Sequence, residues 1–195
     1  DSSRRSEVSR LWSELVETLK HKNRYFPGDK FLSLLGMLKA FEDTLEKRSS
    51  FYRAREMDFQ LSNAVKDRDV KKKRGFPADE MGAPPFDKAT SGRANPSRIA
   101  CLYVANTPET ACAEVYSGMN KAISVARFKV LRDLKIINLC EQSDTKKSKL
   151  SEGEKQLFTI LKRTFSTPYK DKNDETYLET QYVAAYLQSQ RYAGI

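Results

Sequence analysis

Histidine, paired cysteines and long apolar stretches are scarce or missing in this chain of 195 residues. Its one histidine, His21, and three cysteines without a C-x-x-C pair argue against a zinc site and a histidine-based catalytic triad. No apolar run approaches the roughly 18–20 residues of a membrane helix, and the first ten residues lack the apolar segment of a signal peptide. We therefore expect a cytoplasmic protein with no membrane span, no bound metal, a surface His21 and small buried thiols.

The signatures of several common enzyme classes are also missing. The chain has no glycine-rich phosphate loop, no G-x-S-x-G and no H-E-x-x-H. These absences argue against P-loop nucleotide hydrolysis, the α/β-hydrolases and the zinc proteases.

Acidic residues are outnumbered, with 26 Asp and Glu against 35 Lys and Arg and a net charge of +9. Such an excess attracts nucleic acid or a negatively charged cofactor. The basic residues are dispersed, and the two local runs, Lys71–Arg74 and Lys146–Lys149, lie in polar stretches. Because such runs are usually solvated surface, we do not expect nucleic-acid binding. A basic interaction module without enzymatic activity remains an alternative.

The N-terminal quarter has the apolar spacing of two amphipathic helices. Apolar residues recur every three or four positions over 7–20 and again over 30–47, and the segment 25–29 separates them. Neither helix could bury its apolar stripe alone. Residues 1–48 are therefore predicted to be a helical hairpin that packs on the rest of the chain or on a partner, ahead of a main domain at 51–195.

The remaining chain predicts an α+β fold, with small mixed or antiparallel sheets and flanking helices. Thr107-Pro108-Glu109 has the residues that begin a helix. Thr180 and Gln181 are expected to face inward. The expected elements are a strand at 51–55, a polar loop at 58–92, a buried strand at 99–105, a helix at 107–116, strands at 121–130 and 134–139, and helices at 150–165 and 175–192.

Several polar side chains stand within apolar or tightly turned segments. Arg93 and Asn95 lie in a turn before the expected buried strand, Tyr103 lies within that strand, Glu114 has small or apolar neighbours on its helix, and Arg53 lies in the first strand. Each also has a structural interpretation. Tyr103 could be core, Arg93 a turn-stabilising cation, Arg53 an edge cation and Asn95 only a turn residue, while Glu114 is as readily exposed as partly buried.

These residues fall in segments that follow one another in a familiar order. The chain over 51–195 resembles the RES domain family, which is named for its Arg, Glu and Ser. The segments that carry the resemblance are Phe51–Arg55, Gly92–Pro96, Leu102–Ala105, Glu109–Ala111, Ala113–Val115, Val125–Phe128, Leu131–Leu134, Tyr177–Gln181 and Tyr192–Ile195.

The resemblance implies a fold similar to that of ADP-ribosyltransferase toxins and NAD as the substrate. Characterised members are bacterial toxins, often paired with an antitoxin that occludes the active site. They degrade NAD by hydrolysis or phosphorolysis, and some transfer ADP-ribose to a protein. The family serine follows a Gly-Ile like Gly194–Ile195, so we expect the domain to continue beyond Ile195.

The resemblance also suggests roles for the candidate residues. Arg53 and Arg93 would hold the pyrophosphate or ribose through charge-assisted hydrogen bonds. Tyr103 would stack on the cationic nicotinamide, and Glu114 would accept from a ribose hydroxyl and face the developing positive charge. Asn95 would add a hydrogen bond. The expected catalytic residues are thus Glu114, Arg53 and Tyr103.

Overall fold

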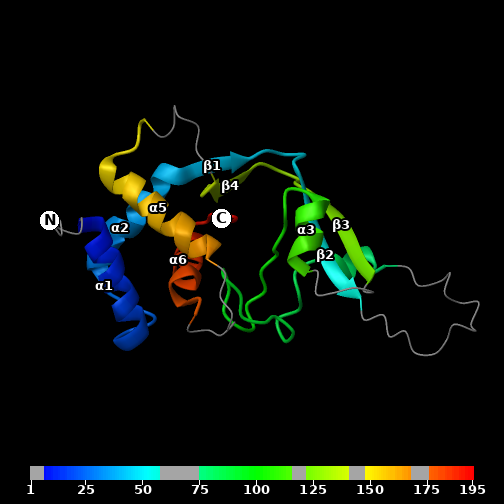
Figure 1. Ribbon diagram of the computed structural model, residues 1–195, viewed down its shortest axis with the longest axis horizontal. Coiled ribbons are helices and arrows are strands. Elements are labelled where there is room, and N and C mark those ends of the chain that lie inside the picture. The colour runs from blue at the N-terminus through cyan, green and yellow to red at the C-terminus, as the bar shows by residue number, and fades with distance from the viewer. Residues whose placement is uncertain (1–6, 58–74, 116–121, 141–147, 168–175) are drawn as a thin grey trace, which may run out of the picture. The chain divides into compact units, whose positions relative to one another are not determined.

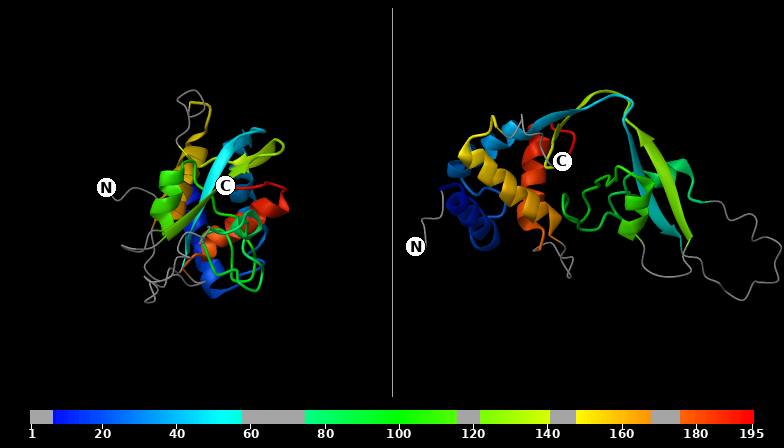
Figure 2. Two further views of the ribbon diagram at one scale, coloured as in Figure 1. Left: turned by 90° about the vertical axis from the view of Figure 1, so that its right-hand side faces the viewer. Right: turned by 45° about the horizontal axis from the view of Figure 1, so that its top comes forward.

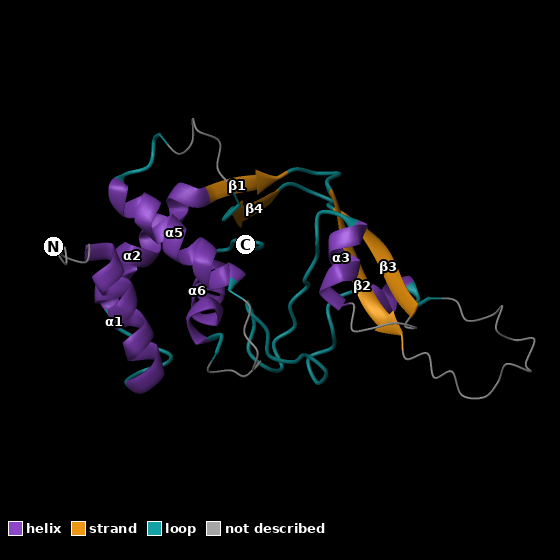
Figure 3. Cartoon of the chain, in the orientation of Figure 1, coloured by secondary structure: helices purple, strands orange, loops and turns teal. Residues whose placement is uncertain are grey.

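The computed structural model describes residues 7–57, 75–115, 122–140, 148–167 and 176–195. It has helices and short antiparallel strands, as expected for an α+β fold (Figures 1 and 3). The chain forms two compact units. The helical unit comprises Asp1–Leu45, Ala89–Ile99 and Leu134–Ile195, and the sheet unit comprises Glu46–Lys88 and Ala100–Asp133.

The helical unit is built around one apolar core. Its helical elements are α1 (Glu7–His21), η1 (Asp29–Phe31), α2 (Leu32–Gly36), η2 (Met37–Phe41), α5 (Glu152–Ser166) and α6 (Leu178–Ser189). α1 packs against α5 and α6, as the views in Figure 2 also show. Trp12 and Leu15 of α1 share the core with Leu161 of α5 and Val183 of α6. The N-terminal helices are therefore part of the same core as the C-terminal helices.

The amphipathic helices are placed as the sequence predicts. α1 matches the expected helix at 7–20, and its C-terminal His21 is exposed. α5 begins with a capping box in which Ser151 and Glu154 bond reciprocally. Thr180 and Gln181 of α6 are buried, so the expectation that they face inward is confirmed. None of the helices in the described ranges is long and apolar enough to cross a membrane.

The helix expected over 30–47 is wrong in its second half. Helical turns end at Phe41, and Glu42–Leu45 forms strand β1, which pairs antiparallel with β4 (Leu134–Ile137). Glu42 is held there by Lys135 at 2.8 Å and by the Tyr192 hydroxyl at 2.8 Å. This long-range strand pairing outweighs the helical spacing of the local sequence.

The sheet unit pairs β2 (Ser50–Met57) with β3 (Ala122–Lys129) in antiparallel register. α3 (Pro108–Val115) packs on β2, and η4 (Ala78–Met81) also contacts that strand. The expected strand at 51–55 and helix at 107–116 are confirmed. The Thr107 hydroxyl caps α3 by accepting the Thr110 N–H at 3.1 Å.

The buried strand expected at 99–105 is wrong. Ala105 forms an isolated bridge with Tyr52, with N–O distances of 2.7 and 2.8 Å, but the preceding residues form no ladder. Ile99 is 53% exposed and Tyr103 42% exposed. The apolar sequence of this segment predicted a buried strand, but among the described residues no strand pairs with it before Ala105. A strand becomes buried only when other elements cover its faces.

The expected buried thiols are also corrected. Cys101 and Cys112 are half-buried, whereas Cys140 is exposed, and all three are free. The expected polar loop at 58–92 lies partly outside the described residues, and its described part contains η4.

Candidate functional site

The turn at Gly92–Asn95, in the helical unit, is closed by hydrogen bonds of its own backbone. Gly92 N–H donates to the Asn95 oxygen at 2.9 Å, and Asn95 N–H donates to the Gly92 oxygen at 3.4 Å. Arg93 and Ala94 therefore occupy the tip of a tight turn, the geometry of a two-residue hairpin connection. We call Gly92–Asn95 the arginine turn.

Asn95 stabilises this turn and the loop that follows it. Its side chain is buried, and its amide nitrogen lies 2.9 Å from the Thr90 oxygen, 3.1 Å from the Pro96 oxygen and 2.9 Å from the Ile99 oxygen. An asparagine amide that bonds backbone carbonyls closes a loop much as a backbone turn does. The geometry of the described residues thus matches the structural interpretation of Asn95, and its direct bond to NAD stays a prediction.

Arg93 reaches from the tip of the turn to the end of α5. Its guanidinium donates to the backbone oxygen of Phe165 and to that of Thr167, the latter at 3.0 Å. The last carbonyls of a helix have no intrahelical partner and form its negative pole, so a cation there is stabilising. A guanidinium carries more N–H donors than these two bonds use, which leaves it able to bind an anion as well.

Gln181, on α6, anchors the same turn from outside. Its amide nitrogen lies 2.9 Å from the Gly92 oxygen, 3.0 Å from the Asn95 oxygen and 3.0 Å from the Ser91 hydroxyl. Sequence reasoning predicted that Gln181 faces inward but missed this contact. The signal available was a polar side chain on the buried side of an otherwise apolar helix.

Arg53 and Arg55 project from β2 in the sheet unit. Arg53 donates to the Gly82 oxygen, Arg55 donates to the Glu80 oxygen, and the Arg55 guanidinium lies 4.2 Å from the centre of the Phe76 ring. Burial, followed by the charge of Arg55, lowers the pKa of Arg53, although a guanidinium stays protonated. These contacts hold a pair of cations on one strand.

Tyr103 lies beside Cys101 in the loop before the Ala105 bridge. Burial raises the pKa of the Cys101 thiol, while a hydrogen bond with Tyr103 and the nearby charge of Arg53 oppose that rise. Arg53, Cys101 and Tyr103 therefore form one cluster in the sheet unit. Cys101 is a member of this cluster that sequence reasoning missed.

Glu114 lies in the last turn of α3 and is exposed. Of the two arrangements that the sequence left open, the structure has the solvated carboxylate. The small residues of α3 let the helix pack closely on β2, because Ala111 is buried against Ala54 and Ala105. Glu114 is thus held on a helix that is firmly seated on the arginine-bearing strand.

The predicted site residues are divided between the units. The sheet unit contains Arg53, Tyr103 and Glu114, and the helical unit contains Arg93 and Asn95. The convergence of both sets on one dinucleotide stays a prediction. No group of three or more potential metal ligands occurs within the residues described.

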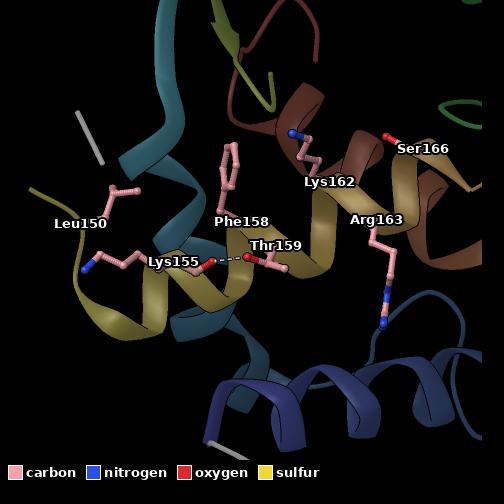
Figure 4. Close-up of a pocket in the computed structure, with 7 residues that line it drawn as sticks. All are labelled: Leu150, Lys155, Phe158, Thr159, Lys162, Arg163 and Ser166. Atoms are coloured by element: carbon pink, nitrogen blue, oxygen red, sulfur yellow. Dashed lines mark hydrogen bonds between the residues drawn. The ribbon is translucent and has the colours of Figure 1, made fainter. Parts of the chain in front are cut away.

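A groove of about 740 Å³ lies along α5 in the helical unit (Figure 4). Phe158 and Leu150 give it an apolar wall, and Lys155, Lys162 and Arg163 line it with cations. Phe158 also packs edge-on against Phe41, with ring centres 5.4 Å apart, which accounts for its place in the core. The groove contains none of the predicted site residues.

Comparison with curated proteins and with solved structures finds no match. The family model described as RES domain matches residues 68–195, about two thirds of the chain. This range contains the arginine turn, Tyr103 and Glu114 in the order in which the resemblance places them, whereas Arg53 lies before it. The chain therefore belongs to the RES domain family, which is associated with NAD-related toxin function.

Proposed function

We propose that this protein consumes NAD by breaking the bond between nicotinamide and ribose, with water or phosphate as the acceptor, and that it acts as a bacterial toxin. The observation that carries the proposal is the family match over 68–195, which includes Arg93, Tyr103 and Glu114. The absence of the common hydrolase signatures from the sequence agrees with it, because this reaction needs neither a histidine triad nor a bound metal.

To catalyse this reaction, the protein must bind NAD and stabilise the positive charge that develops on the ribose. The nicotinamide ring nitrogen is cationic in NAD, so nicotinamide leaves as a neutral base and takes the bonding electron pair. The ribose becomes oxocarbenium-like. Water, which releases a proton to the solvent, or phosphate then forms the new bond at the same carbon, as in glycoside cleavage. Oriented binding and a nearby negative charge are the two ways in which such a step is accelerated.

Glu114 is the residue that we propose faces the developing positive charge. A carboxylate near the ribose would accept from a ribose hydroxyl and stabilise the oxocarbenium. Its exposure leaves it open to a ligand, and the packing of α3 on β2 fixes its helix relative to Arg53.

Tyr103, Arg53 and Arg93 are the residues that we propose bind the dinucleotide. Tyr103 is 42% exposed, so a ligand can reach this side chain, and an aromatic ring suits the cationic nicotinamide. The two guanidiniums suit the pyrophosphate or ribose because their planar forks form paired hydrogen bonds. A partner protein that occludes these residues would inhibit the toxin.

Incubation of the protein with NAD and analysis of the products by mass tests the proposal. Free nicotinamide with free ADP-ribose indicates hydrolysis, and a phosphorylated ADP-ribose formed only with phosphate indicates phosphorolysis. Label retained on protein would instead favour ADP-ribosyl transfer. If NAD stays intact and the protein binds duplex nucleic acid with a steep salt dependence, the basic interaction module is the correct function.

Glu114→Gln tests the catalytic assignment, since it keeps the size of the side chain and removes its charge. The loss of one transition-state partner should lower the rate about 100-fold or more. Glu109→Gln makes the same change at an exposed position in the first turn of α3. It is the matched control and should retain the rate. Near-normal turnover by the Glu114 variant would refute the assignment.

A further inference from the structure

Gln181 has no role in the function proposed above, yet it joins two parts of the helical unit through a buried side chain. Its exposed fraction is 7%. Its amide nitrogen contacts both Gly92 and Asn95 oxygens, at 2.9 and 3.0 Å. These are the two carbonyls that close the arginine turn, so one side chain holds the whole base of the turn.

The hydrogen-bonded pair Gly92 and Asn95 fixes the backbone position of Arg93. α6 is seated in the core by Leu178, Val183 and Leu187, so Gln181 is a fixed anchor. On the other side, the Arg93 guanidinium is held at the end of α5. Arg93 is therefore fixed both at its backbone and at its tip, by two helices of the same core.

We infer that Gln181 is a positioning residue for Arg93, and through it for the pyrophosphate of NAD. The inference rests on the proposed function, because only that function gives Arg93 a ligand. Gln181 itself needs no contact with NAD. A glutamine suits this place because its amide donates hydrogens to carbonyl oxygens and carries no charge that would have to be buried.

Gln181→Met removes the donor and keeps a side chain of similar length. A displaced arginine should weaken binding more than the bond-breaking step, so KM for NAD should rise about tenfold or more while kcat changes by less than about threefold. Gln188→Met makes the same change at an exposed position of α6 and should leave both constants unchanged. An unchanged KM in an active Gln181 variant overturns the inference.

A double-mutant comparison separates action through Arg93 from a general effect on folding. If Gln181 acts through Arg93, then Gln181→Met should add little to the KM increase caused by Arg93→Ala. Independent, multiplying effects would show that Gln181 acts by another route and would overturn the inference. Gln181→Glu is a second variant for the case that Gln181→Met folds poorly. Its carboxyl faces the same oxygens and can donate only when protonated, so KM should fall toward the normal value as the pH is lowered.

Amide hydrogen exchange tests the positioning step without NAD chemistry. The amide of Gly92 donates within the turn, so Gln181→Met should speed its exchange while amides in α1 keep their rate. Equal protection in both proteins overturns the inference, as does a similar acceleration throughout α1, which would indicate general destabilisation. Absence of NAD turnover by the unmodified protein refutes the proposed function, and the exchange experiment still decides whether Gln181 holds the turn.

Discussion

The amide nitrogen of Gln181 lies 3.0 Å from the backbone oxygen of Asn95, although 86 residues separate them in the chain. This contact joins the C-terminal helix α6 to the arginine turn. The contacts of Arg93 with the end of α5 complete the connection. The two C-terminal helices of the helical unit thus support a turn on which the proposed binding of NAD depends.

Arg93 should contribute to both stability and NAD binding. Arg93→Ala removes two hydrogen bonds to the last carbonyls of α5, and we expect unfolding to become easier by about 1–3 kcal/mol. Arg93→Lys keeps the charge but cannot span both carbonyl oxygens, so it should lower kcat/KM for NAD by about tenfold or more. Urea unfolding and steady-state kinetics measure the two effects.

The matched control for Arg93 is Arg163→Lys, which makes the same change at an exposed arginine of α5. It should leave both stability and turnover unchanged. If Arg93→Lys lowers stability but leaves kcat/KM unaltered, Arg93 only caps the helix and has no part in binding.

Tyr103 should act mainly through its ring. Tyr103→Phe removes the hydroxyl that bonds Cys101 but keeps the aromatic face, so kcat/KM should fall by less than about threefold, whereas Tyr103→Ala should lower it by about tenfold or more. Steady-state kinetics with NAD tests this difference. Equal losses in the two variants would indicate that the hydroxyl, and not the ring, is what NAD requires.

The helices were the part of the fold best predicted from the sequence, because the residues that specify a helix lie within the helix or next to it. The apolar spacing of α1 and the residues Thr107-Pro108-Glu109 of α3 each specify an element within a few residues. Leu45 shows the limit: its helical spacing is real, but its pairing with Leu134 is decided by residues far away in the chain. The segment 99–105 fails for the same reason, since no local pattern says which strand will cover it.

The candidate site was predictable only as a set of residue types. Arg93, Tyr103 and Glu114 were identified from their family pattern, but a sequence does not show that Arg93 bonds the end of α5. It also does not show that the Asn95 side-chain amide donates hydrogen bonds to three backbone carbonyls of its own loop. The sequence predicted that Gln181 faces inward. Its partners, the Gly92 and Asn95 carbonyls, depend on how α6 packs and could not be predicted.

The β1–β4 pairing should depend on pH through Glu42. Hydrogen bonds from Lys135 and then from Tyr192 lower the pKa of Glu42 below its ordinary value. A carboxyl whose pKa is lowered by folding contributes stability above its unfolded pKa, and that contribution is lost as pH falls through the folded value. The stability difference between the unmodified protein and Glu42→Gln should therefore be present at neutral pH and vanish in acid.

Urea midpoints across an acid titration measure this difference for Glu42. Because the pair is exposed, we expect a small effect, and Glu46→Gln, at an exposed carboxyl next to the strand, is the control. A difference that persists unchanged in acid would show that the side chain acts through packing and not through its charge.

The N-terminal helix should be indispensable to the helical unit. Leu15 of α1 is fully buried against the cluster that includes Leu161 and Val183. Leu15→Ala should lower the free energy of unfolding by about 2–5 kcal/mol, because it leaves a cavity in a close-packed core. Ser13→Ala, on the exposed side of the same helix, should change it by less than about 0.5 kcal/mol. Urea unfolding followed by amide exchange in α5 and α6 measures both. If α5 and α6 keep their protection in the Leu15 variant while α1 opens, then α1 is an attached segment and not a part of the core on which the arginine turn rests.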